Sequence, residues 1–91
     1  MNITELITIV KKKIQDEIKI EKIIIEKIYI EDKSFLHKNH AGHQEGKFHL
    51  KVTITSNELK NLSRIEGNKK IYKVLDKEIK EHIHSLQILI S

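Results

Sequence analysis

Apolar residues in this 91-residue chain repeat at two different spacings, and each spacing is confined to its own stretch of sequence. From Ile3 to Ile18 they recur every three or four residues, which is the period of an amphipathic helix. Asn2 and Glu5 stand at capping-box spacing and predict where this helix begins. Over residues 47–55 apolar and polar residues alternate, which predicts an antiparallel strand with one wet face. The chain therefore combines helix and strand.

The remaining segments supply two more strands and two more helices. The sequence predicts a strand over about 26–32, a loop over 33–46 and a strand over 83–90. Between the loop and the last strand, after the strand over 47–55, it predicts a short helix capped by Ser56 and ending near Gly67, and then a longer helix whose inner face carries Ile71, Val74, Leu75 and Ile79. The order helix–strand–strand–helix–helix–strand predicts an α+β fold, in which helices cover one face of a small sheet. The length suits one small domain.

Composition excludes several classes of protein. The chain has no cysteine, so it holds no disulfide and no metal site built from its own thiolates. No apolar run approaches the roughly 20 residues that span a membrane. Because no secretory signal is visible either, we expect an intracellular protein, in the cytoplasm or, if a presequence was removed, in mitochondria. The net charge is +4, but Arg64 is the single arginine, and specific readers of nucleic acid favour arginine.

Histidine carries the chemistry of this sequence. His37, His40 and His43 lie at three-residue steps in the predicted loop, His49 lies on the wet face of its strand, and His84 opens the last strand. Neutral imidazole is a ligand for zinc, copper or iron, although a loop rich in histidine is often merely polar. No H-E-x-x-H or G-x-S-x-G pattern is present, so we expect no enzyme.

The helix that precedes the last strand carries a row of lysines. Its members are Lys69, Lys73, Lys77 and Lys80. Such a row could follow a phosphate backbone, or it could be a solvated face whose charges pair with Asp76, Glu78 and Glu81. A G-x-x-G loop that would clamp RNA is absent.

Residues 30–43, IEDKSFLHKNHAGH, resemble the BolA-like family, in which an I-x-D-x-S strand end leads into an H-A-G-H loop. The matching residues here are Asp32, Ser34, His40, Ala41, Gly42 and His43. The likeness continues through FHLKVTITS (48–56), KKIYKVLDKEI (69–79) and IHSLQI (83–88). His49 and His84 stand at histidine positions of the family. The likeness covers about residues 28–90 without a gap.

The sequence also departs from the family's pattern. Leu59 replaces a usual Phe, Asn61 a usual Gly and Ser85 a usual Ala. Residues 67–69 stand where the family commonly has an R-H-R triplet, which weakens the support for nucleic-acid binding through that helix. The N-terminal segment is several residues longer than is typical.

The resemblance implies a class II KH-like fold with a three-stranded sheet, formed by one domain over residues 1–91. Within it, a variable helix occupies about residues 2–22, and the family-like region about 28–90. It also implies a non-enzymatic adaptor that pairs with a monothiol (CGFS-type) glutaredoxin, in iron–sulfur cluster trafficking or iron regulation. A [2Fe–2S] cluster bridges such pairs, with glutaredoxin and glutathione thiolates on one side and histidines on the other. We expect no cofactor in the isolated chain, which we expect to be a monomer.

Carried over to this sequence, the resemblance makes His84 the first ligand candidate. His43, His40 and His49 compete for the second position. A chain without cysteine agrees with this assignment, because iron–sulfur clusters usually need four thiolates and a partner would supply the sulfurs.

Two other functions stay open from the sequence. The first is a DNA-binding transcriptional or stress-morphology regulator, which would use a helix-turn-helix-like segment, residues 57–81, and its basic side chains Lys69, Lys70, Lys73 and Lys77. The second is a zinc-binding or purely scaffolding module.

Overall fold

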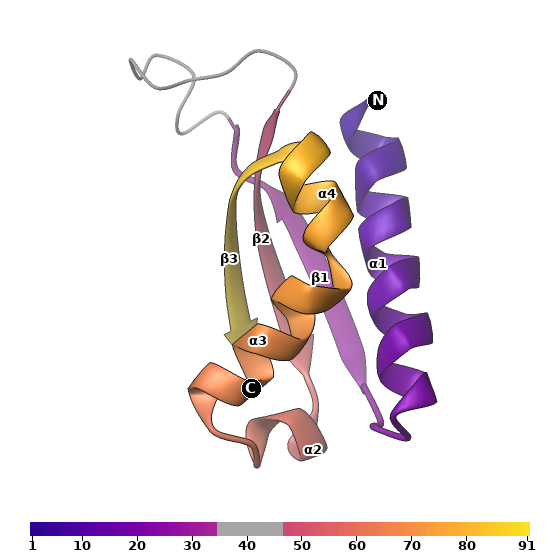
Figure 1. Cartoon of the computed structure of the whole chain (residues 1–91), viewed down its shortest axis with the longest axis vertical. Helices are drawn as coiled ribbons and strands as arrows, with labels where there is room; N and C mark the ends of the chain where they lie inside the picture. The colour runs from indigo at the N-terminus through magenta and orange to yellow at the C-terminus, as the bar shows by residue number, and fades with distance from the viewer. Residues whose placement is uncertain (35–46) are drawn as a thin grey trace.

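The structure is a computed structural model of the chain, and the residues described are 1–34 and 47–91. The elements in chain order are α1 (Ile3–Ile20), β1 (Lys27–Asp32), β2 (Phe48–Thr55), α2 (Asn57–Lys60), α3 (Arg64–Val74), α4 (Asp76–Glu81) and β3 (Ile83–Ile90). The strands form one sheet in the order β1-β2-β3, and the helices lie along one face of it (Figure 1). The expected α+β fold is confirmed.

The helix α1 begins and ends as local chemistry dictates. The Asn2 side chain accepts the Glu5 N–H at 2.8 Å and donates to the Glu5 carboxylate at 2.9 Å, which confirms the predicted cap. At the other end Ile23 N–H donates to the Ile18 carbonyl and Lys22 N–H to the Lys19 carbonyl. These two bonds form a Schellman motif that places Lys22 at a φ of 61°.

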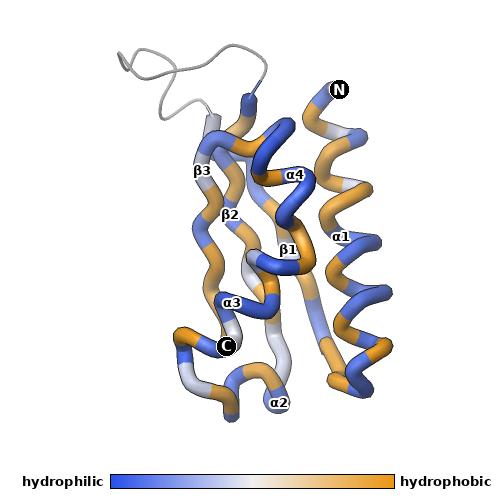
Figure 2. The backbone as a smooth tube through the Cα atoms, viewed as in Figure 1, coloured by the Kyte–Doolittle hydropathy of each residue, from blue (hydrophilic) through white to orange (hydrophobic). Residues whose placement is uncertain are grey.

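The inner stripe of α1 packs against the sheet to form the core. Bands of apolar and polar residues follow one another along α1 in Figure 2. The fully buried side chains of α1 are Leu6, Val10, Ile14 and Ile18, and the core adds Ile28, Leu50, Val52, Ile54, Leu59, Ile71, Leu75 and Ile83. No helix in the described ranges is long and apolar enough to cross a membrane.

The sheet is mixed. β1 pairs antiparallel with β2, so that Ile28 lies opposite Ile54, whereas β3 runs parallel to β2. The antiparallel prediction for β2 is therefore right on one side and wrong on the other. The physical reason is the connection, because three helices carry the chain from the end of β2 back to the end of the sheet at which β2 begins.

The helices after β2 differ from the prediction at Gly67. Ser56 caps α2 as expected, but α2 ends at Lys60 and a new helix starts after Ser63, whose hydroxyl accepts the Glu66 N–H at 3.1 Å. The spacing S-x-x-E is a capping box, and it starts a helix that continues through Gly67. Gly67 is buried, and a Cβ there would lie 3.0 Å from Cδ1 of Ile90. Gly67 therefore allows α3 to pack closely against β3.

The long helix predicted after Gly67 is also divided. Leu75 has φ −98° and ψ 14°, which separates α3 from α4. Leu75 is fully buried and Ile79 half-buried, so the apolar stripe continues inward across the break. Because the period is preserved, apolar spacing alone could not reveal the break.

Candidate metal centre

A β-bulge shapes the start of β3. Phe48 lies opposite Ile83 and His49 opposite Ser85, so His84 is an extra residue on β3. Bulges of this kind bend a strand and re-aim a side chain. The alternation of burial is broken here, since His84 and Ser85 are both exposed. The bulge thus presents the His84 imidazole to solvent at one end of the sheet.

The structure brings His84 together with a second histidine. The ring centres of His49 and His84 lie 4.9 Å apart, and the rings meet edge to face at 64°. His49 itself is only 4% exposed, so its predicted place on a wet strand face is wrong. The prediction was right about the face, because position 49 lies on the side of the sheet opposite the helices. At the end of a sheet, however, a residue on that side can still be buried.

The backbone of His49 is held by the end of β1. The His49 N–H donates to Ser34 Oγ at 3.1 Å, and the His49 carbonyl accepts the Lys33 N–H at 2.7 Å. Ser34 is held in turn, because its own N–H donates to Asp32 Oδ1 at 3.0 Å. The D-x-S residues quoted for the resemblance thus position His49.

The ring of His49 is held from β3. Nδ1 of His49 lies 2.6 Å from Ser85 Oγ, which is a short hydrogen bond between register partners on neighbouring strands. Sequence reasoning noted Ser85 only as a departure from alanine. No spacing in the sequence could have found this contact, because it depends on the shifted register between β2 and β3.

The other histidine candidates lie outside the described residues. This holds for His40 and His43, and also for His37. Within residues 1–34 and 47–91, no group of three or more His, Asp or Glu side chains is placed to hold a metal ion. The described part of the candidate centre is therefore the pair His49 and His84.

The lysines proposed for nucleic acid share their surface with acidic residues. Lys70 Nζ donates to Glu21 at 2.8 Å and is half-buried. Lys69 and Lys73 line the same hollow between α1 and α3, of about 480 Å³, together with Glu17. Lys77 is exposed on α4. The pairing expected for this face holds for Lys80 with Asp76, whereas Glu78 pairs with Lys13 of α1 instead.

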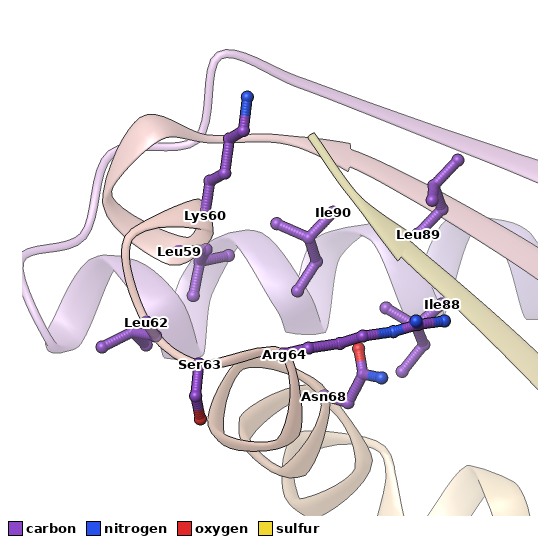
Figure 3. A pocket seen from close by; sticks show the side chains of 9 residues that line it. All are labelled: Leu59, Lys60, Leu62, Ser63, Arg64, Asn68, Ile88, Leu89 and Ile90. Carbon is purple, nitrogen blue, oxygen red and sulfur yellow. The ribbon is translucent and has the colours of Figure 1, made fainter.

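A second hollow, of about 360 Å³, lies between the α2–α3 turn and the end of β3. Its lining residues are Leu59, Lys60, Leu62, Ser63, Arg64, Asn68, Ile88, Leu89 and Ile90. The Arg64 side chain extends across it towards Ile88, as Figure 3 shows. Two of the nine lining residues are cationic and none is acidic. Lys60 and Arg64 lie within the helix-turn-helix-like segment predicted over residues 57–81, but neither was named there as a nucleic-acid contact.

The mixed three-stranded sheet, its one-sided helical cover and the order of its elements define a small α+β domain, the expected class II KH-like fold. The family model of the BolA-like protein matches residues 20–91, and the chain belongs to this family. The predicted family is thereby confirmed.

The relatives agree with this membership. The chain is 32% identical over 59 residues to the "DNA-binding transcriptional regulator BolA" of Haemophilus influenzae, across 65% of this chain and 54% of that protein. It thus spans about half the length of that curated relative. Among solved structures, the BolA domain of SufE1 from Arabidopsis thaliana has a TM-score of 0.71 at 25% identity. BolA1 from the same plant has a TM-score of 0.70 at 24% identity and shows the fold alone. Each covers 92% of this chain, and this chain covers 87% of each.

Proposed function

We propose that this protein is a non-enzymatic adaptor that pairs with a monothiol glutaredoxin and supplies histidine ligands to a bridging [2Fe–2S] cluster. The role would be cluster trafficking or iron regulation. Glutaredoxin and glutathione would supply the thiolates, because this chain has no cysteine. Replacing two thiolates of a cluster by imidazoles raises its reduction potential.

The observation that carries the proposal is the exposure of His84 on a bulge, in contact with a second imidazole. The donor set fits the group, since histidine nitrogen ligates iron in mixed thiolate–histidine clusters. His84 would be the first ligand. The second would be His43, His40 or His49.

The test is reconstitution of the complex. The purified chain is mixed with a CGFS-type glutaredoxin, iron, sulfide and glutathione, and the absorption spectrum and mass of the complex are measured. We expect a heterodimer with charge-transfer bands, and we expect His84→Ala to abolish or change those bands.

A neighbouring histidine provides the matched control. His82 lies two residues before His84, and its side chain is 3.6 Å from the Glu81 carboxylate. His82→Ala should leave the spectrum unchanged. A His84→Ala complex with the wild-type spectrum would refute the ligand assignment.

A second candidate function is DNA binding, and the cationic hollow beside α3 favours it. Lys60 and Arg64 flank an apolar floor without an acidic neighbour in the lining, and the H. influenzae relative is named as a DNA-binding regulator. Phosphate contacts make affinity fall as salt rises. If the hollow binds DNA, Arg64→Gln should weaken binding to a promoter fragment and flatten the salt dependence.

Lys80 provides the control for this function, because it is exposed and paired with Asp76. Lys80→Gln should have a smaller effect than Arg64→Gln. Equal effects of both substitutions would indicate non-specific attraction to a chain of charge +4 and would exclude a defined DNA site.

A further inference from the structure

We infer that His49 is a positioning residue for His84, and that Ser85 holds His49 in that role. The inference rests on the proposed function, in which His84 is a metal ligand. It assigns His49 a supporting contact, so that the second nitrogen ligand is a different histidine.

Contacts from the described residues hold both the backbone and the ring of His49. Its backbone N–H and carbonyl are bound by Ser34 and Lys33, and its ring Nδ1 is bound by Ser85. The residue is 4% exposed. Because the ring is buried and bound by Ser85, turning it towards a partner protein would break this hydrogen bond, whereas a ligand for a cluster carried by that partner must be accessible.

His84 needs a fixed neighbour. An exposed side chain samples several rotamers, and ordering it on binding weakens a complex roughly two- to tenfold. The His49 ring meets the His84 ring edge to face at 4.9 Å, within the range of favourable aromatic pairs. This contact limits the orientations of His84 before any partner arrives.

Ser85 completes the arrangement through the bulge. Because His84 is the extra residue, Ser85 rather than His84 becomes the register partner of His49. The hydroxyl can donate or accept, so it can hold Nδ1 in either tautomer and fix the plane of the ring. Removing groups that orient the ligands of a metal site lowers metal affinity. Ser85 acts one step further out, because it holds His49 and the His49 ring in turn contacts His84.

The first experiment uses the free full chain and needs no cluster. Nitrogen-15 NMR of the histidine rings reports the hydrogen bond at His49 Nδ1, and ring-to-ring nuclear Overhauser effects report its contact with His84. We expect Ser85→Ala to shift the His49 nitrogens and weaken the His49–His84 effects, and Ser85→Thr to restore both. Unchanged signals in Ser85→Ala would overturn the role of Ser85, whatever the cluster does.

The second experiment separates positioning from ligation. In the reconstituted glutaredoxin complex, pulsed EPR of the reduced cluster counts the coupled histidine nitrogens. His49→Phe keeps an aromatic ring beside His84 but removes both nitrogens, and we expect the count to stay the same. Ser85→Ala should also preserve the count while lowering the affinity of the complex roughly two- to tenfold.

Loss of one coupled nitrogen in His49→Phe would make His49 a ligand and overturn the inference. If no variant, including the wild type, shows histidine coupling, the proposed function fails instead. The NMR result on the free chain then still decides whether Ser85 and His49 hold the His84 ring. If His49→Phe does not fold, His49→Leu, which also removes both ring nitrogens, takes its place in the nitrogen count.

Discussion

The ion pair between Lys13 and Glu78 joins α1 to α4, and its removal should destabilise the fold. Lys13 Nζ donates to Glu78 Oε1 at 2.8 Å, and the Glu78 side chain is 8% exposed. Lys13→Met keeps most of the aliphatic stem but removes the charge. The carboxylate of Glu78 then stays in a nearly buried position without this cation.

The magnitude follows from burial. Removing one partner of a fully buried ion pair costs about 3–5 kcal/mol. The Lys13 side chain is 34% exposed, so water screens part of the interaction, and we expect a loss of about 2 kcal/mol. For a domain of this size that loss lowers the Tm by roughly 8–16 °C.

The assay is urea and thermal unfolding followed by circular dichroism, with the double variant Lys13→Met/Glu78→Met as the key comparison. The double variant should recover most of the loss, because no charge is left in the interface. Lys12→Met is the matched control, since Lys12 pairs with Asp16 at an exposed position. A Lys13→Met variant as stable as Lys12→Met would refute the reasoning.

Three further predictions concern local geometry and are checked by the same unfolding measurements. Lys22→Gly should stabilise the chain by about 1 kcal/mol, because glycine adopts the φ of 61° at the end of α1 without strain; a loss of stability would contradict this. Gly67→Val should lower the free energy of unfolding by about 2–3 kcal/mol, because a Cβ at this position would already lie 3.0 Å from Cδ1 of Ile90. An unchanged stability would show that the Ile90 side chain moves aside at little cost. Ser56→Ala should lower the free energy of unfolding by about 2 kcal/mol, because the buried Ser56 hydroxyl donates to the Ile24 carbonyl at 2.6 Å and accepts the Leu59 N–H. Ser63→Ala is the control and should cost less, because the Ser63 cap is exposed.

Local signals in the sequence were sufficient for most elements. The cap at Asn2, the stripe of α1 and the bounds of β3 at Ile83 and Ile90 depend on residues close together in the chain, and the structure has them as predicted. Gly67 was misjudged because glycine ends helices more often than it packs inside them, and the Ser63 capping box was overlooked.

The candidate site could be predicted only in part. His84 and His49 were named from the sequence, and the structure places them in contact. The hydrogen bond between His49 and Ser85 was not predictable, because it depends on a one-residue shift in pairing between distant strands. The burial of His49 was not predictable from its place on the outer face of the strand. A side-chain period of two carries no information about such a shift.

The parallel pairing of β2 with β3 also has a consequence for how the chain folds. β2 is central in the sheet, yet one of its edges can be satisfied only after all three intervening helices have been synthesised. Until then a ribosome-bound intermediate would present an apolar strand with an open edge, which is a template for aggregation. Contacts this distant in sequence also slow folding, so the last eight-residue strand should act as the late, rate-determining closure of the whole domain.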